Sequence, residues 1–468
     1  MRSTAGTLTR GAAAPAHPRA ASPRAVLVVM CAGYFLVLLD VTIVNVALPE
    51  IGRGIGADVS GLQWVVDGYA LALATFMLAG GTVGDLRGHK RVVLTGLVVF
   101  GAGSLGCGVA PNVGLLISAR VVQGVGAALL LPGTLAIISR AFPDGPAQAR
   151  AIGVWAGIGS LALPAGPLLG GLLVGAFGWR AIFLVNVPVV VLAAVAAARS
   201  VRESTGVGAS RLDGAGVGLG IAVLGAATFA CIEAGRAGIG SPAVIAAAVA
   251  AVAAALTFVA MERARGEGAM LPVGLFRRPA FTVANACAGT MNLCTVGTLF
   301  VLTLFLQSVQ GRPPLQAGVA LVPLFAPLVV LAPLVGRLVG RVGPRVPMAA
   351  GFATAAAGLA LLLASNAGSG YAPLLPAFLL WGIGLGFVTP AVVATAIAAV
   401  PPGRAGLASA INNTARQAGG AIGIAIAGAV AGSPARGGGF VSGLHVVALA
   451  AAALYAVAAA TGLVLLRD

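Results

Sequence analysis

Residues 25–49 read AVLVVMCAGYFLVLLDVTIVNVALP, an apolar run with a single carboxylate, Asp40. About 20 apolar residues in an α-helix are enough to cross a bilayer. The run is too long for the apolar part of a signal peptide, and no small-residue cleavage site precedes its polar end. It therefore predicts a first membrane helix.

The composition of the whole chain argues against most soluble classes of protein. Apolar residues make up 59% of its 468 residues and charged residues only 9%, whereas a soluble domain usually carries about 25% charged residues. The net charge of +16 comes from short basic clusters between apolar runs, which is typical of membrane loops and not of a nucleic-acid surface. The five cysteines lack metal-ligand spacing and no nucleophile–base constellation is visible, so neither a metal site nor an enzyme is expected.

Apolar runs continue to the end of the chain and predict an all-α membrane protein. Residues 1–24, rich in Ala, Pro and Arg, are expected to form a disordered cytoplasmic tail. Fourteen spans are expected at about residues 25–49, 63–83, 92–110, 113–138, 149–175, 181–198, 214–233, 241–261, 280–306, 316–336, 346–365, 372–398, 405–430 and 442–466.

The basic residues orient these spans. With the N-terminus inside, 21 of the 28 Lys and Arg residues fall in cytoplasmic segments and 5 fall outside. Short cytoplasmic loops of membrane proteins carry such an excess of basic residues. The sequence therefore predicts a multi-pass protein of the cell (inner) membrane with both termini in the cytoplasm.

Two glycine patterns recur at nearly one offset. The G-x3-D-x2-G-x-K pattern of residues 81–90 recurs as G-x3-G-x2-G-x-R at 336–345, an offset of 255, and the G-x-G-x5-P pattern of 124–132 recurs at 382–390, an offset of 258. Duplicated six-helix halves are typical of transporters that rock about a midplane site. The predicted segments are the tail 1–24, an N-terminal half 25–200, a linker 201–277 with two additional membrane helices, and a C-terminal half 278–468.

Charged residues inside spans are costly and are therefore the first candidates for function. With a rise of about 1.5 Å per residue, Asp40 and Arg120 lie about 14 and 11 Å below the outer surface and can meet if their helices touch. Burial and a nearby guanidinium act in opposite directions on carboxyl protonation, so this pair is the preferred proton-coupling site. A static ion pair is the alternative. Asp67, which is shallower, is a second candidate unless it lies in the headgroup region, and Glu233 is left open.

Three further stretches are interpreted by residue type. The tight loop after the second span is expected to act as a cytoplasmic gate, or else to be a solvated basic loop; its residues are Gly81, Asp85, Gly88, Lys90 and Arg91. Small residues and prolines in the fifth span predict a kinked, smooth helix that packs closely or slides: Gly166, Pro167, Gly170 and Gly171. Polar residues within spans predict a substrate cavity, or hydrogen bonds between helices alone: Asn45, Asn412, Asn413, Arg416 and Gln417.

In this order the motifs resemble the major facilitator superfamily, and within it the fourteen-spanner drug:proton antiporter family of multidrug or quaternary-ammonium efflux type. The resemblance covers nearly the whole chain after residue 25 and rests on residues 39–49, 63–69 (QWVVDGY), 81–91, 120–124 (RVVQG), 166–171 (GPLLGG), 179–188 and 412–423. It implies the major-facilitator fold and export by alternating access, with Asp40 and Arg120 handling the proton and Asp85 the gate. Leu86 departs from the loop motif, which usually has Arg there.

Together these observations predict proton-coupled antiport of small hydrophobic or cationic compounds out of the cell. The alternatives are a narrow exporter of one antibiotic, lipid or metabolite, an importing symporter, and a non-transporting sensor. No cofactor is expected, because the proton gradient supplies the energy. The expected partners are the small-molecule substrate, protons and membrane lipids, without nucleic acid, and the chain is expected to be a monomer.

Overall fold

The computed structural model describes residues 22–142, 145–203, 213–266, 273–401, 405–436 and 438–466, and these residues form helices and connecting turns without a β-strand. The first helices are α1 (Pro23–Ile55), α2 (Val59–Arg87), α3 (His89–Gly108), α4 (Val113–Ala141), α5 (Gly145–Phe177), α6 (Ala181–Leu184) and α7 (Asn186–Ser200). Two long helices follow, α8 (Gly214–Ala237) and α9 (Pro242–Arg265). The remainder is η2 (Val273–Arg277), α10 (Pro279–Leu304), η3 (Phe305–Val309), α11 (Pro314–Ala320), α12 (Val322–Val342), α13 (Arg345–Leu361), η4 (Leu362–Ala364), α14 (Leu374–Ala398), α15 (Ala405–Ala431), η5 (Pro434–Arg436) and α16 (Gly438–Leu465).

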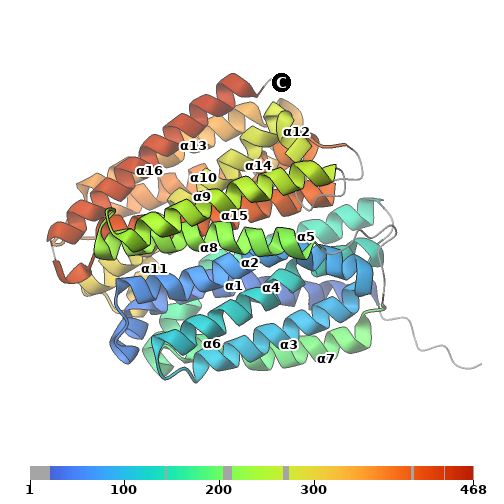
Figure 1. The fold of residues 1–468 in the computed structure, drawn as a ribbon, viewed down its shortest axis with the longest axis horizontal. Helices are drawn as coiled ribbons and strands as arrows, with labels where there is room; N and C mark the ends of the chain where they lie inside the picture. Colours follow the sequence, from blue (N-terminus) through green and yellow to red (C-terminus); the bar gives the residue numbers. More distant parts are fainter. Residues whose placement is uncertain are drawn as a thin grey trace, which may run out of the picture.

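The long helices run side by side as rods, with α1–α7 on one side of the molecule and α10–α16 on the other (Figure 1). Helix α5 of the first group packs on α11 and α12 of the second, and α2 packs on α15. Helices α8 and α9 pack on each other, and α8 also lies against α2 and α15. Helix α8 therefore borders the seam between the groups, and α9 packs on α8.

Twelve helical segments among the described residues are long and apolar enough to cross a membrane. Helices α2 and α15 are not among these twelve, although they run alongside the others (Figure 1). The chain is therefore an all-helical, multi-pass membrane protein. The count of fourteen spans stays a prediction.

The repeated glycines have equivalent packing roles. A Cβ on Gly126 of α4 would lie 2.8 Å from the carbonyl oxygen of Gly96 in α3, and one on Gly384 of α14 would lie 2.5 Å from the backbone nitrogen of Ala355 in α13. Both distances are too short for a real Cβ, so both helix pairs require glycine at this position. The 258-residue offset between Gly126 and Gly384 thus corresponds to a repeated close helix contact.

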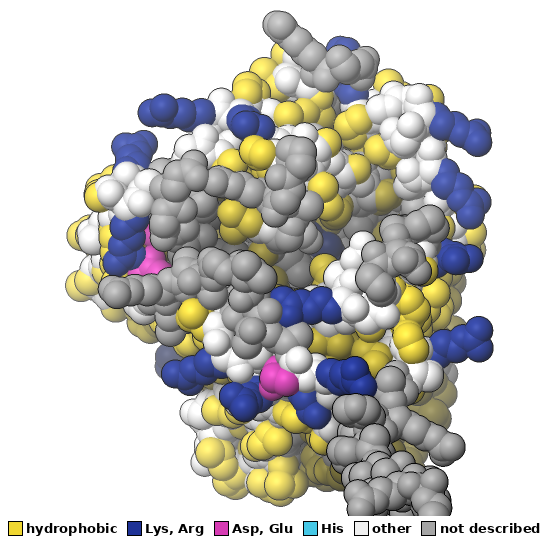
Figure 2. Space-filling view, turned by 90° about the vertical axis from the view of Figure 1, so that its right-hand side faces the viewer, with side chains coloured by type: hydrophobic (Ala, Val, Ile, Leu, Met, Phe, Trp, Pro, Cys, Tyr) yellow, Lys and Arg dark blue, Asp and Glu magenta, His cyan; other side chains and the backbone are white. Residues whose placement is uncertain are grey.

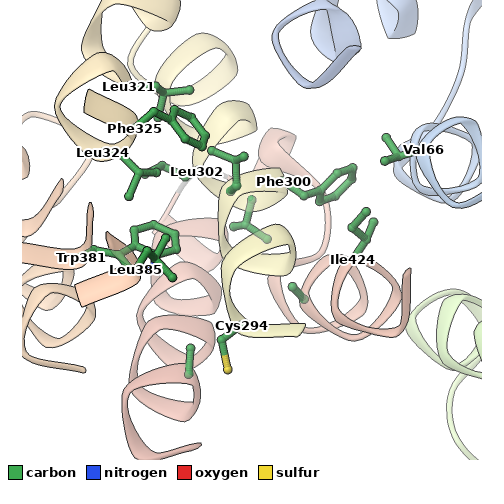
Figure 3. Packing of buried hydrophobic residues seen from close by; sticks show 14 of the residues in the cluster. Val66, Cys294, Phe300, Leu302, Leu321, Leu324, Phe325, Trp381, Leu385 and Ile424 are labelled. Atoms are coloured by element: carbon green, nitrogen blue, oxygen red, sulfur yellow. The ribbon is translucent and has the colours of Figure 1, made fainter. Parts of the chain in front are cut away.

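A hydrophobic cluster joins the two groups of helices. Figure 3 shows Phe300 of α10 pointing toward Val66 of α2 and Ile424 of α15, while Trp381 of α14 lies on the other side of α10. Phe300 and Trp381 are fully buried. Burial of a large side chain is worth about 1.5–3 kcal/mol, so this cluster stabilises the contact between the groups.

Basic residues gather at one end of the rods. Figure 2 shows Lys and Arg side chains around this face and few acidic ones. Helices α2, α9 and α12 end here, with Arg87, Arg265 and Arg341 in their last turns. We call this face the basic end and the other face the opposite end.

Candidate functional site

The candidate site begins with an ion pair between Asp40 of α1 and Arg120 of α4, both almost completely buried. Nη1 of Arg120 donates to Oδ2 of Asp40 and also to Oε1 of Gln123, at 2.7 Å. Nε donates to the carbonyl oxygen of Val65 at 3.0 Å, and the ring centroid of Tyr69 lies 4.2 Å from Cζ. The buried guanidinium therefore has partners on several sides.

Oδ1, the other carboxylate oxygen of Asp40, accepts two amide hydrogen bonds. Nε2 of Gln123 donates to it at 2.9 Å and Nδ2 of Asn186 at 3.3 Å. Both amides also donate to Oγ of Ser104, each at 3.0 Å, and that hydroxyl donates to the carbonyl oxygen of Phe183. We call Asp40, Arg120, Gln123, Ser104 and Asn186 the carboxylate network. It joins α1, α3, α4 and α7.

The network contains three residues that the sequence analysis did not assign to the site: Gln123, Ser104 and Asn186. Gln123 had a signal, because it follows Arg120 by three residues and helical residues at this spacing share a face. Ser104 and Asn186 are neutral residues on separate helices. Only the packing of α3 and α7 against α1 brings them to Asp40.

Asp67 of α2 lies apart from the network. Its side chain is completely buried, and neither carboxylate oxygen has a hydrogen-bond partner among the described residues. It acts electrostatically on Cys231 of α8, which places it toward the additional helices. Glu233, in the same helix α8, is partly buried.

Helix α5 connects the network with the second group of helices. A Cβ on Gly170 would lie 2.9 Å from the carbonyl oxygen of Ile43, so α5 packs directly on α1 three residues from Asp40. Gly166 packs in the same way on Thr42. On the side toward α11, a Cβ on Gly171 would lie 2.6 Å from Cα of Leu315. The small residues of α5 thus serve two interfaces at once.

Pro167 completes this contact. It lies inside α5, and its carbonyl oxygen lies against Gly318 of α11. Gly318 leaves room for that carbonyl because it has no Cβ. The predicted smooth helix is therefore in contact with both helix groups.

The loop at the basic end is bound to the last turns of α7 and to Glu203, which follows that helix. The backbone nitrogen of Lys90 donates to Oε1 of Glu203 at 3.1 Å, and Nζ of Lys90 donates to the carbonyl oxygen of Ala198 at 2.7 Å. Arg91 pairs with Glu203 at 3.5 Å. Gly88 has a φ of 100°, which favours glycine, and a side chain there would collide with Glu203. Glu203 was not among the predicted gate residues, and the side chain of Asp85 lies outside the described part of the chain.

Two glutamines link the helix groups at the opposite end. Nε2 of Gln63 in α2 donates to the carbonyl oxygens of Ile424 and Ala425 in α15, at 3.1 and 2.9 Å. Nε2 of Gln307 in η3 donates to the carbonyl oxygen of Val46 in α1 at 2.8 Å. These bonds tie the two groups together on that side.

A cavity of about 430 Å³ lies toward the basic end. Its described walls come from α1, α2, α3, α4, α5 and α15. Gly81 and Asn413, which were predicted for the gate and for the cavity, both line it. A second cavity, of about 650 Å³, lies at the opposite end, with Gln63, Arg236 and Ser308 among its lining residues. The glutamine bonds thus tie the two groups together beside a second hollow.

The other polar residues predicted for the cavity have different positions. Asn412 is buried, and its amide lies 3.4 Å from Oδ1 of Asn285 in α10. Asn45 is buried and donates to the carbonyl oxygen of Val41 within α1. Arg416 and Gln417 are partly buried in α15. The structure thus places Asn413, but neither Asn412 nor Asn45, on this cavity wall.

Comparison with known proteins identifies relatives over most of the chain. The family profile described as Major Facilitator Superfamily matches residues 30–424. The chain is 40% identical over 398 residues to the multidrug resistance protein Stp of Mycobacterium tuberculosis, covering 85% of this chain and 74% of that protein. It is 34% identical to the methylenomycin A resistance protein of Bacillus subtilis, covering 86% and 87%. It is 32% identical to the tetracenomycin C resistance and export protein of Streptomyces glaucescens, covering 88% and 77%.

Solved structures share the arrangement of helices. A bacterial homologue of the human lysosomal transporter Spinster, solved in an inward-facing and unoccupied conformation, superposes with a TM-score of 0.69. The match covers 94% of this chain and 96% of that one at 18% identity. At such identity the likeness shows the fold alone.

Proposed function

The chain belongs to the Major Facilitator Superfamily and is a membrane transporter rather than an enzyme, and from this premise we propose that it exports drug-like compounds from the cell in exchange for protons. The names of the relatives support export, since they are a multidrug resistance protein and antibiotic resistance proteins. The observation that carries the proton coupling is the buried Asp40–Arg120 pair. No cofactor is needed, because the proton gradient supplies the energy.

In the proposed cycle, a proton on Asp40 cancels the charge that holds Arg120. The guanidinium then loses its counterion while it stays bonded to Gln123 and Val65. Removing one charge of a buried pair costs about 3–5 kcal/mol, which is enough to shift an equilibrium between two packing arrangements. Helix α5 packs on α1 beside Asp40 and on α11 across the seam, so it is the element that transmits the change.

The proposal includes a membrane orientation. The basic end is the cytoplasmic side, both termini lie there, and the chain crosses the membrane fourteen times, with α2 and α15 counted as spans. The excess of basic residues at this end supports the orientation. Reporter fusions at Glu203 and at Gly311 test it, because the first should report cytoplasm and the second the outside. The reverse pattern would invert the proposed direction of proton entry.

Everted membrane vesicles test the coupling. Addition of a substrate should dissipate the proton gradient in vesicles that contain the wild-type chain, and Asp40→Asn should abolish this response. Asp58→Asn is the matched control, because Asp58 is exposed and caps α2, a role that Asn fills equally well. An Asp40→Asn variant with full proton exchange would refute the assignment of Asp40.

A narrow exporter of one antibiotic is the second candidate. The relatives include proteins named for methylenomycin A, puromycin and tetracenomycin C, each a single compound. Expression in an efflux-deficient host, across a panel of unrelated drugs, separates the two candidates. Protection against one chemical class alone would favour the narrow exporter.

A further inference from the structure

A cation without a partner among the described residues lies near the cavity at the basic end. Nε of Arg416 is buried without a hydrogen-bond partner, and no ion pair or hydrogen bond joins this side chain to another described residue. Its charge acts on Tyr34, which lines the cavity. Asn413, three residues earlier on α15, lines the same cavity. This spacing places Arg416 on the same face of the helix.

An aromatic pair forms the wall beside Arg416. The rings of Tyr34 and Trp155 stack with centroids 3.8 Å apart and planes inclined by 16°. Gly159 leaves room for the Tyr34 ring against α5, because a Cβ at this position would overlap the ring. Nε1 of Trp155 is buried and has no acceptor among the described residues. A second unused donor thus adjoins a flat aromatic surface.

The other described walls carry no negative charge. They are apolar or neutral, apart from His89, and include Met77, Leu131, Leu135, Ser139 and Asn413. Neither Asp nor Glu is among the described lining residues. Asp40 is bound within the carboxylate network and Asp67 lies toward α8. The described wall therefore offers no counterion for a cation, and Arg416, three residues beyond Asn413 on α15, adds a positive charge near it.

We infer that this cavity binds flat aromatic compounds that carry an acceptor oxygen, with a carboxylate or phenolate bound more tightly than a carbonyl. The ring extends the Tyr34–Trp155 stack, and the oxygen accepts from Arg416 and from Nε1 of Trp155. Buried donors without acceptors are unfavourable, so an oxygen that satisfies them adds to the binding free energy. The inference rests on the proposed function and narrows its substrate class, away from the cationic compounds that the sequence analysis allowed.

Three probes with one ring system test this preference on the purified full-length chain. Acridine-9-carboxylate is an anion, acridone is neutral with a carbonyl oxygen, and N-methylacridinium is a cation. Binding is measured at equilibrium without a proton gradient, from probe fluorescence polarisation. The carboxylate should bind most tightly and the acridinium most weakly. Tightest binding by the acridinium overturns the inference.

Substitutions of Arg416 test the contributions of its charge and of its planar guanidinium group to binding. Arg416→Gln should weaken the carboxylate roughly 10- to 100-fold, since bonds to charged groups are the strong ones, while the acridinium is unchanged or binds more tightly. Arg416→Lys keeps the charge without the planar fork and should retain the order of the probes with weaker carboxylate binding. Equal losses for all three probes in Arg416→Gln would mean that Arg416 is only structural, and would overturn the inference.

Two more variants test the aromatic wall. Trp155→Phe keeps a ring but removes the N–H, so acridone binding should fall roughly 2- to 10-fold. Arg312→Gln is the charge control, because Arg312 lies after η3 at the opposite end, bonded to Gln310, and should leave all three affinities unchanged. These binding measurements use no proton gradient, so they do not depend on whether transport is coupled to protons. A cation preference here together with an intact vesicle response would refute the substrate class and leave the proposed antiport standing.

Discussion

The two halves of the chain have the same helix contacts but different interiors. With the offset of 258 that relates Gly126 to Gly384, Arg120 corresponds to Phe378 and Gln123 to Trp381. Arg120 and Gln123 belong to the carboxylate network, whereas Phe378 and Trp381 are fully buried members of the hydrophobic cluster. One backbone arrangement thus holds a charged interior in the N-terminal half and an apolar one in the C-terminal half.

The difference between the two interiors bears on the role of the charged residues Asp40 and Arg120. In the C-terminal half, the corresponding positions on α14 hold the large apolar side chains of Phe378 and Trp381. These positions can therefore be packed without an ion pair. Buried ion pairs are often no more stabilising than apolar residues of similar volume. The N-terminal half therefore does not need Asp40 and Arg120 in order to pack, and proton coupling gives a reason for keeping them.

The largest effect is expected when Arg120 is replaced by phenylalanine, the residue at the corresponding position 378. Arg120→Phe leaves Asp40 buried without its counterion and should lower the free energy of unfolding by about 3–5 kcal/mol, measured by denaturant titration of the purified protein. The double variant Arg120→Phe/Asp40→Leu should regain most of this stability and lack proton exchange. A single variant as stable as the wild type would show that the carboxylate does not depend on Arg120.

The shared helix contacts should respond equally in both halves. Gly126→Ala and Gly384→Ala each force a Cβ into a neighbouring backbone and should each cost about 1–3 kcal/mol. Gly153→Ala is the control, since a Cβ there meets nothing within 4 Å and alanine favours a helix. Thermal unfolding compares the three variants, and a loss confined to one half would contradict the packing equivalence.

A smaller effect is expected at the edge of the carboxylate network. Asn186→Ala removes one of the two amides that donate to Oδ1 of Asp40, which should cost about 1 kcal/mol of stability and alter the pH dependence of vesicle exchange. Thr354→Ala is the comparison in the C-terminal half, because its exposed hydroxyl bonds only within α13. An unchanged pH profile for Asn186→Ala would place this residue outside the coupling machinery.

The smallest effect is expected in the additional helices, which belong to neither half. Asp213 caps α8 and pairs with Arg265 at the end of α9. Burial raises the pKa of Asp213, but hydrogen bonds from Arg265 and from the Gly216 N–H outweigh it, so the pKa lies below its ordinary value of 3.8. The contribution to stability is therefore complete above pH 3.8 and is lost as the pH falls through the lowered pKa.

Removal of this cap measures its contribution. Asp213→Ala should cost about 1 kcal/mol near neutral pH, and less in strong acid, by denaturant titration. Asp213→Asn keeps the cap and should cost less than the alanine variant. A loss that grows as the pH is lowered would contradict the sign derived from Arg265 and Gly216.

The sequence predicted the helices well where a span is one continuous apolar run. The span expected at 214–233 is α8 at Gly214–Ala237, while the span expected at 316–336 is two helices, α11 and α12, which meet at Leu321 and Val322. The similar depths of Asp40 and Arg120 predicted that the two can meet if their helices touch, and the structure pairs them. The position of Arg416 near Tyr34 could not be predicted in this way, because two helices distant in sequence must first come together.

At the opposite end, the amides of Gln63 and Gln307 tie the two helix groups together by donating to main-chain oxygens of the other group. Neither a glutamine amide nor a peptide carbonyl titrates in the physiological range. On the proposed orientation, a fall in pH outside the cell would therefore leave these hydrogen bonds intact. The two helix groups would separate here only when helices inside the bundle rearrange. In the proposed orientation, protons that arrive from outside would therefore meet a connection between the helix groups that their arrival does not weaken.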